Sequence, residues 1–304
     1  MPRTKIILNP NAGKGYGATI RPDLEKVLGR LGVQFDLVET THTGHAIELA
    51  SEAVQQGYDI IAAVGGDGTT NEVVNGMMAA ASQNPMGTLA CIPAGSGNDF
   101  AVMNGTATNL EVACQAIADG RTQVIDLGHL RLDGQIERYF DNAVGTGFDA
   151  LVVLETRRMT HLRGMAMYLP AVLKTIFLTM HIPSVEMTVD GRTEQVRPLM
   201  VVACNGPREG STFHLTPDAL YDDGFLDILI AREVSKLEML ALMPRFMKGT
   251  HLSHRAVSTV QARQVTLKSS DPLYVHVDGE ILNDHSHTVE IEVIPHALRM
   301  ISSF

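Results

Sequence analysis

The chain has 304 residues, of which 45% are hydrophobic and 19% are charged, and its formal net charge is −10. This length is sufficient for two domains with separate hydrophobic cores. The negative charge argues against general attraction to nucleic acid or anionic lipid, so contact with a membrane would need a local basic patch.

The cysteines and the apolar segments bear on the cellular compartment. Three cysteines are scattered along the chain without a C-x-x-C pair, which gives no disulfide framework and is typical of a reducing compartment. The N-terminal residues do not resemble a signal peptide. The most apolar long segment, residues 165–182, is interrupted by Pro170 and Lys174 and does not resemble a membrane span. We therefore expect a cytoplasmic protein without a transmembrane segment.

Strand-like and helix-like segments alternate through the first 127 residues. The expected strands are residues 5–8, 35–39, 59–64, 88–92 and 123–127, and the expected helices are residues 24–31, 46–53, 70–81 and 110–119. The strands are almost continuously apolar, which is typical of parallel strands whose two faces are both covered by helices. This order predicts an α/β domain with a parallel sheet over residues 1–127.

The pattern changes after residue 127. Asp-Gly pairs at 133–134, 190–191 and 278–279 stand between strand-like segments, as they do at hairpin turns. The expected strands are residues 185–189, 196–204, 225–231, 264–267, 274–277 and 289–294, with helical stretches at 151–180 and 235–249. We expect an antiparallel β-sandwich-like domain over residues 128–292, and an interdomain cleft.

Three glycine-rich loops follow expected strands of the first domain, at residues 9–13, 65–69 and 93–99. Glycine lets a backbone approach phosphate oxygens, and the start of a helix offers N–H groups to them. None of the loops is a Walker A loop or a dinucleotide fingerprint. A carboxylate such as Asp67 would repel bare phosphate, so it suits a place beside Mg²⁺ or a substrate hydroxyl. The alternative for GGDG alone is a strand-to-helix turn with an aspartate cap.

The sequences of these loops, taken together, resemble a known family. NPNAG at 9–13, GGDGT-x-NE at 65–72 and PAGSGNDFA at 93–101 are similar to the diacylglycerol kinase catalytic domain, whose family includes bacterial soluble lipid kinases and the sphingosine and ceramide kinases. Further similar motifs follow in the family's order: DLG at 126–128, GFD at 147–149, PDAL at 217–220, DG at 223–224 and DGE at 278–280. GGDGT alone is shared with NAD kinases, whereas the ordered set is specific and spans nearly the whole chain.

The resemblance implies ATP as phosphoryl donor, Mg²⁺ as cofactor and a lipid hydroxyl as acceptor, met at the membrane surface. Asp67 and Asp99 would organise the magnesium and the acceptor hydroxyl, and Glu280 would be the general base. The final segment, residues 293–304, would return to the first domain. The residues implied to bind the nucleotide are Asn9, Pro10, Asn11, Ala12, Gly13, Thr40, Gly65, Gly66, Asp67, Gly68, Thr69, Thr70, Asn71, Glu72 and Ser96.

Two motifs of the second half allow two interpretations. Without the resemblance, DGE at 278–280 predicts only a hairpin turn, whereas the resemblance favours Glu280 as a base. The acidic stretch 220–225 could be a solvated turn. In similar bacterial kinases it holds a structural Mg²⁺, with the Asp223 carboxylate and the Leu220 and Phe225 carbonyls as implied ligands.

The sequence departs from the family pattern in two places. Ser96 stands where bacterial relatives often have threonine, which keeps the hydroxyl. The glycine-rich run that such relatives often carry has fewer glycines here, at residues 207–211. The resemblance therefore does not predict the details of the acceptor side.

Two basic clusters could touch anionic lipid, although polar helix faces are the simpler interpretation. Their members are Arg157, Arg158, His161 and Arg163, and then Arg245, Lys248, His251, His254 and Arg255. The twelve histidines show no spacing typical of a metal site. A homodimer is the default expectation for the oligomeric state.

Two alternative functions stay open beside the lipid kinase. An NAD kinase-like enzyme would share GGDGT, but NPNAG and PAGSGNDFA argue against it. A non-catalytic lipid- or nucleotide-binding protein could use the same fold, but the presence of Asp67, Asp99 and Glu280 favours catalysis.

Overall fold

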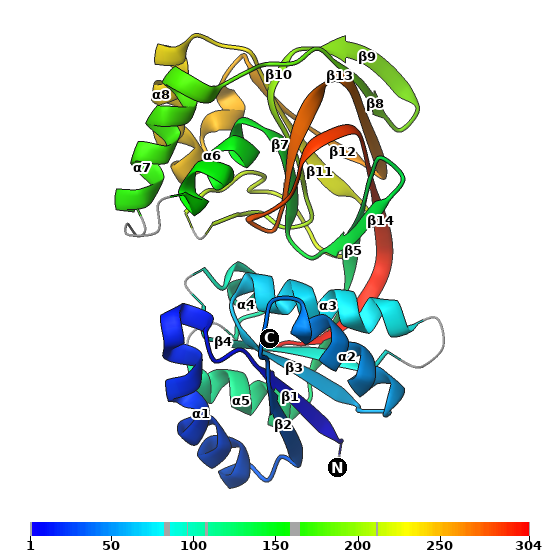
Figure 1. The fold of residues 1–304 in the computed structure, drawn as a ribbon. Helices are drawn as coiled ribbons and strands as arrows, with labels where there is room; N and C mark the ends of the chain where they lie inside the picture. Colours follow the sequence, from blue (N-terminus) through cyan, green and yellow to red (C-terminus); the bar gives the residue numbers. More distant parts are fainter. Residues whose placement is uncertain are drawn as a thin grey trace. The chain divides into compact units, whose positions relative to one another are not determined.

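The computed structural model describes residues 2–81, 86–95, 97–106, 109–158, 165–210 and 212–303, and at residues 165 and 166 the backbone only. The chain folds as two compact units (Figure 1). Unit 1 comprises Met1–Leu127 with Pro295–Phe304, and unit 2 comprises Gly128–Ile294. Each boundary falls within a long strand, β5 (Thr122–Leu132) or β14 (Glu280–Ile301), so each of these strands contributes residues to both units.

Unit 1 is an α/β domain with a parallel sheet, as predicted. Its strands lie in the order β4-β3-β1-β2 and are all parallel. The end of β14 joins the edge at β4, where Met300 pairs with Leu89 in parallel register. The strands are β1 (Thr4–Leu8), β2 (Phe35–Glu39), β3 (Ile60–Gly65) and β4 (Thr88–Pro93), and the helices are α1 (Ala12–Arg30), α2 (His45–Gln55), α3 (Asp67–Ala81), α4 (Asp99–Met103) and α5 (Leu110–Asp119).

Both faces of the unit 1 sheet are covered. Because successive strand residues face opposite sides, Ile6 and Leu8 of β1 pack in one core with residues of α1 and α5, including Leu24. Helices α2 and α3 lie on the other face (Figure 1). Every residue of β3 is buried as a result.

Unit 2 is an antiparallel β-sandwich-like domain, also as predicted. Its strands follow the order β12-β11-β10-β7-β13-β14; the β8–β9 hairpin pairs with β13, and β5 pairs with β6 and β14. The strands not yet given are β6 (Ile136–Phe140), β7 (Ala143–Gly147), β8 (Val185–Val189), β9 (Arg192–Val196), β10 (Pro198–Cys204), β11 (Leu226–Arg232), β12 (Val257–Ala262) and β13 (Gln264–Val277). The helices are α6 (Phe148–Arg157), α7 (Met165–Lys174), the π-helical η1 (Thr175–Thr179), α8 (Lys236–Lys248) and the 3₁₀-helical η2 (His251–Ser253).

The alternation of side chains along β10 explains the layers of unit 2. Val201 and Ala203 face a core that they form with residues of the β5–β6 pair, the β8–β9 hairpin and β13–β14. Val202 and Cys204 face a second core, which includes residues of α6, α7, η1 and α8 such as Ile176. Helices therefore cover the face of β7, β10 and β11 that lies opposite the sandwich core.

Four strands of unit 2 were not predicted, namely β6, β7, β9 and β12. Four of the five residues of β9 are exposed, so its sequence RTEQV lacks the apolar alternation that marks a half-buried strand. The two predicted segments 264–267 and 274–277 are parts of one strand, β13, whose register shifts between Lys268 and Leu273. Within the described residues, no helix combines the length and the apolar composition needed to cross a bilayer.

The packing of α2 on α3 gives a test of the unit 1 fold. A Cβ added at Gly76 of α3 would lie 2.2 Å from the Ile47 carbonyl oxygen and 2.8 Å from the Ala50 Cβ. Gly76→Ala should therefore destabilise the protein by about 1–3 kcal/mol through overpacking. The control is Gly29→Ala in α1, where a Cβ would meet nothing within 4 Å, and which should stabilise by about 0.5–1 kcal/mol. Denaturant unfolding measures both, and equal effects of the two substitutions would contradict this packing.

Candidate functional site

The three glycine-rich loops of unit 1 lie together at the carboxyl ends of β1, β3 and β4. The Asn9 N–H donates to the Val64 carbonyl at 2.9 Å, which joins the first loop to β3. The Gly65 carbonyl accepts from the N–H groups of Ala94 and Gly95 at 2.8 and 3.1 Å, which joins the second and third loops. The Asn9 side chain donates to the Thr69 hydroxyl at 3.0 Å. Parallel strands with adjacent ends thus bring the three sequence motifs into contact, at the edge where open α/β sheets bind ligands.

The second and third loops touch through their backbones. A Cβ added at Gly95 would lie 2.3 Å from the Gly66 Cα, closer than any real side chain could be placed. The loops can therefore approach this closely only because glycine stands at this point. The absence of side chains at Gly66 and Gly95 therefore permits contact between the two loops, in addition to any approach of the backbone to phosphate.

Asp67 and Asp99 are brought to neighbouring places by this contact. Asp67 is the first residue of α3, and its Oδ1 accepts the Phe100 N–H at 3.1 Å. Asp99 directly precedes Phe100, begins α4 and is 2% exposed. Carboxylate oxygens are the ligands that Mg²⁺ prefers, so the donor set of these two loops fits the implied metal. Ser96, predicted to bind the nucleotide, lies outside the described residues.

Asn98 holds the third loop closed, a role that the sequence did not single out. Its φ is +58°, in the left-handed region that asparagine tolerates better than most residues. Its side-chain oxygen accepts from the Gly95 N–H at 2.9 Å, and its amide donates to the Gly95 carbonyl at 2.9 Å. The sequence feature that could have predicted this role is an asparagine among glycines directly before a helix.

Thr40 and Glu72 shape the segment between β2 and α2. The Thr40 N–H donates to the Leu8 carbonyl at 2.8 Å, beside the first loop. The Glu72 carboxylate accepts from the N–H groups of Gly44 and Ala46 at 2.9 and 3.2 Å. Gly44 is the N-cap of α2 and has no side chain to cap it, so Glu72 supplies that cap from α3. Of the other predicted nucleotide ligands, the side chains of Thr69, Thr70 and Asn71 are buried.

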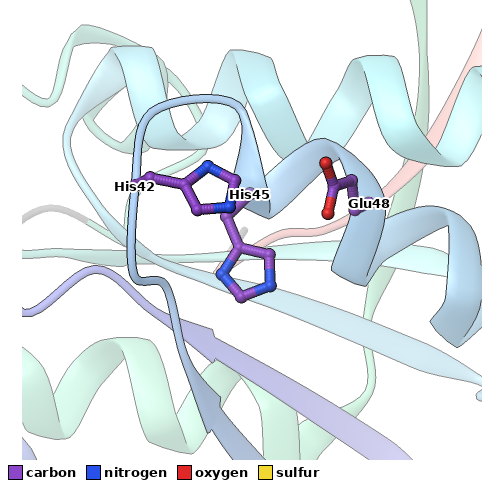
Figure 2. A group of neighbouring side chains, drawn as sticks. All are labelled: His42, His45 and Glu48. Carbon is purple, nitrogen blue, oxygen red and sulfur yellow. The ribbon is translucent and has the colours of Figure 1, made fainter.

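His42, His45 and Glu48 form a group that the sequence did not single out (Figure 2). One ligand atom of each lies within 4.8 Å of the others, and the two rings stack with centroids 4.8 Å apart. The His45 Nδ1 accepts the Thr41 N–H at 3.0 Å, so in the neutral ring the proton is on Nε2 and that nitrogen cannot bind a metal. The group also stands at the start of α2, where the helix dipole disfavours a cation. We therefore place no metal here.

The DGE motif of unit 2 is a hairpin turn with a glutamate directly after it. Asp278 and Gly279 have φ of +47° and +77° and connect β13 to β14 as a two-residue turn. The Asp278 carboxylate accepts from the N–H groups of Asn142 and Ala143 at 3.2 and 2.8 Å. Glu280 is the first residue of β14 and is exposed. Asp278 therefore fixes the turn, while Glu280 is left to face solvent.

The acidic turn before β11 brings carboxylates together. The Asp223 oxygens accept from the Phe225 N–H and from the Gln261 side chain, each at 3.0 Å. Burial, together with the nearby Asp223 charge, raises the pKa of Asp227. The Asp227 Oδ2 is buried and has no hydrogen-bond partner among the described residues. This orphaned oxygen beside a second carboxylate fits the hard cation that the resemblance implies.

Three members of the two basic clusters form ion pairs. Arg158 pairs with the buried Glu155 at 2.8 Å, and His161 and Arg163 lie outside the described residues. In the second cluster, His254 and Arg255 both pair with Glu238, at 3.3 and 3.0 Å. His251 is fully buried, so it belongs to no exposed helix face and cannot contact a lipid.

Comparison with known proteins agrees with this architecture. Residues 3–130 match the family model of the diacylglycerol kinase catalytic domain, and residues 142–302 match that of the YegS C-terminal NAD kinase beta sandwich-like domain. A diacylglycerol kinase of Mycobacterium tuberculosis is 31% identical over 301 residues, covering 98% of this chain and 94% of that protein. The diacylglycerol kinase of Bacillus subtilis is 30% identical over 293 residues, covering 92% and 90%.

A solved structure adds the fold. The diacylglycerol kinase structure from Bacillus anthracis str. Sterne is 22% identical and matches with a TM-score of 0.75, covering 99% of this chain and 97% of that one. The ordered motifs, the two matching domain models and the nearly full-length relatives converge on one family. The chain belongs to the diacylglycerol kinase family and is a kinase-type enzyme.

Proposed function

We propose that this protein transfers the γ-phosphate of ATP to the hydroxyl of a lipid, with diacylglycerol as the first candidate. The observation that carries the proposal is the junction of three glycine-rich loops at the end of a parallel sheet, with Asp67 and Asp99 in two of them. The names of the relatives, which are diacylglycerol kinases, support the choice of lipid.

Unit 1 would hold the nucleotide. Backbone N–H groups of the loops Asn9–Gly13 and Gly65–Glu72 would bind phosphate oxygens, and Asp67 and Asp99 would hold Mg²⁺. When bound, the ion would neutralise charge on the phosphates. Because the loops are fixed by backbone contacts, they can orient the γ-phosphate without rearranging, which is the main contribution expected of a protein to phosphoryl transfer.

Unit 2 would supply the base. Glu280 would take the proton of the lipid hydroxyl as that oxygen bonds to the γ-phosphorus. The bond from this phosphorus to the bridging β–γ oxygen breaks at the same time, and ADP leaves with that oxygen. An exposed carboxylate directly after a fixed turn is suited to this task, because its position is set by Asp278 while its oxygens can reach a substrate.

An apolar patch of unit 2 supports a membrane-bound substrate. Leu169, Leu173 and Phe177 follow one another at intervals of four residues along α7 and η1 and are 38–47% exposed. Leu178 and Leu237 are 78% and 76% exposed. These five residues are called the apolar patch. Lys236 joins its two parts by donating to the Phe177 carbonyl at 3.3 Å. Exposed leucines beside lysine are suited to insertion at the surface of an anionic bilayer.

The decisive experiment is transfer of labelled phosphate from ATP to a panel of lipids in mixed micelles. The panel contains diacylglycerol, monoacylglycerol, phosphatidylglycerol and a sphingoid base, and NAD is included because the second domain model is named after NAD kinase. Phosphorylation of a lipid supports the proposal and identifies the acceptor. Robust formation of NADP, or ATP binding without transfer to any lipid, would overturn it.

Glu280→Gln should lower kcat by about 10²–10⁴-fold, because the amide keeps the size of the side chain but cannot accept the proton. The affinity for ATP should stay unchanged, since the nucleotide loops belong to unit 1. Glu194→Gln is the matched control, because Glu194 also lies on a strand that follows an Asp-Gly turn. A kcat for Glu280→Gln within a few-fold of wild type would remove Glu280 from the mechanism.

Asp223→Ala should remove most of the stabilisation by Mg²⁺, if the acidic turn holds the ion with the Leu220 and Phe225 carbonyls. An ion bound only to the folded protein at 100 times its Kd adds about 2.7 kcal/mol. The melting temperature should thus rise with Mg²⁺ in the wild type and much less in the variant. Asp222→Ala, an exposed neighbour in the same turn, should respond like the wild type. Equal shifts in all three proteins would argue against the site.

Leu178→Glu combined with Leu237→Glu should weaken binding to vesicles of phosphatidylcholine and phosphatidylglycerol. Each buried leucine contributes about 1.5–3 kcal/mol, so the partition coefficient should fall by at least 10-fold in a flotation assay. Turnover of a short-chain, monomeric diacylglycerol should persist. The control is Val260→Glu, which adds one such charge at a 40% exposed valine of β12, and each single leucine variant is compared with it. Unchanged flotation of the double variant would exclude the apolar patch.

A further inference from the structure

A buried histidine lies between two carboxylates in unit 2. His276 is on β13, four residues before Glu280, and is 1% exposed. Its Nε2 lies 2.9 Å from an Asp149 carboxylate oxygen, and its Nδ1 lies 3.4 Å from a Glu209 carboxylate oxygen. Both ring nitrogens therefore face an acid.

The two acids come from different parts of unit 2. Asp149 stands in the first turn of α6, which follows β7. Glu209 belongs to the segment after β10, where it exchanges two backbone hydrogen bonds with Phe213, at 2.8 and 3.1 Å. One imidazole ring thus ties together β13, the start of α6 and the segment around Glu209.

The ring has no room to move. His276 pairs with Gly145 of β7, and a Cβ added there would lie 2.2 Å from the His276 Nε2 and 1.8 Å from an Asp149 oxygen. The absence of a side chain at Gly145 makes space for the contact between imidazole and carboxylate. The position of the ring is therefore set by packing as well as by charge.

The pair of acids determines the protonation of the ring. Nε2 is within hydrogen-bond distance of Asp149, whereas Nδ1 makes no hydrogen bond among the described residues and interacts with Glu209 through charge alone. The imidazolium, which carries its positive charge over both nitrogens, is therefore the form that the two carboxylates favour. Burial alone would lower the pKa of His276, but the charges of Glu209, Asp149 and Asp278 outweigh it and raise the pKa to about 9. Tyr168 and Cys204 also interact with Asp149 and Glu209, and burial raises the pKa of each, so both stay protonated.

We propose that His276 is a positioning residue for phosphoryl transfer, which fixes the strand leading to Glu280 against Asp149 and Glu209. A buried ion pair is weak evidence for stability, because desolvation offsets the attraction, but it does specify one arrangement. The arrangement specified here is that of the base-bearing turn relative to α6 and to the segment around Glu209. The inference rests on the proposed function, since positioning matters only if Glu280 acts on a substrate.

The first test compares His276→Gln with a matched histidine. The control is His129→Gln, because His129 is 8% exposed and also lies between two glutamates, Glu292 at 3.1 Å and Glu137 at 3.7 Å. His276→Gln should lower kcat for the lipid roughly 10–100-fold, since small misplacements of reacting groups have effects of this size. Its KM for ATP should stay unchanged. His129→Gln should lower the melting temperature but keep kcat within about 2-fold of wild type.

The pH profile separates positioning from a general loss of stability. The pKa of His276 in the folded protein, about 9, lies above its ordinary value of 6.5. The contribution of the charged ring to folding stability is therefore complete below pH 6.5 and is lost as the pH rises through about 9. In the wild type kcat should fall as the pH rises through about 9, where the ring loses its charge in the folded protein, whereas His276→Gln should lack this limb and His129→Gln should retain it.

Glu209→Gln provides a second variant should His276→Gln fail to fold. It removes one of the two charges but keeps the pair of His276 with Asp149, so the alkaline limb of kcat should move to lower pH. If the alkaline limb of kcat is unmoved in Glu209→Gln, or kcat of His276→Gln equals that of the wild type, the positioning role of His276 is overturned. The proposed function would not be affected by either result. Absence of lipid phosphorylation by the wild-type protein would instead overturn the proposed function and this role with it.

Discussion

The backbone contact between Gly66 and Gly95 is the constraint on which the geometry of unit 1 depends. Since the two loops meet without side chains between them and share the Gly65 carbonyl as acceptor, the carboxylates that follow each loop start from fixed backbone positions. Asp67 also receives a hydrogen bond from Phe100, in the helix that follows the third loop. A site built in this way needs little reorganisation when charge develops on a substrate, which is what favours phosphoryl transfer.

In unit 2, aspartate side chains join turns to neighbouring segments, whereas in unit 1 the loops are joined by backbone contact at glycines. The three Asp-Gly hairpin turns have positive φ at both residues, and in each the aspartate accepts from two successive N–H groups of another segment. The acceptors and donors are Asp133 with His287 and Thr288, Asp190 with Arg263 and Gln264, and Asp278 with Asn142 and Ala143. The turn interpretation of DGE therefore accounts for Asp278 completely. It leaves Glu280 as the feature that distinguishes this turn from the other two.

The sequence predicted those parts of the structure that depend on local pattern. The α/β and β-sandwich-like classes, the first four strands and the three hairpin turns follow from apolar runs and Asp-Gly pairs, because these report backbone requirements of their own residues. Strand β9 was missed because its exposed residues carry no apolar alternation. The cluster of Asp149, Glu209 and His276 was missed for another reason. Its members are up to 127 residues apart, and each stands in a segment whose own pattern gives no sign of the others.

A histidine between two acids is not by itself a sign of function, as the comparison of His276 with His129 shows. The side chains of Glu137 and Glu292, which flank His129, are 55% and 47% exposed, so water screens their charges. Those of Asp149 and Glu209 are 18% and 16% exposed, and their attraction to the buried ring is screened much less. Of the two clusters, the His276 cluster is therefore the one whose charges interact strongly enough to specify one arrangement of its elements. His276 also lies on β13, the strand that leads to Glu280, so the position of this ring would bear on the proposed reaction.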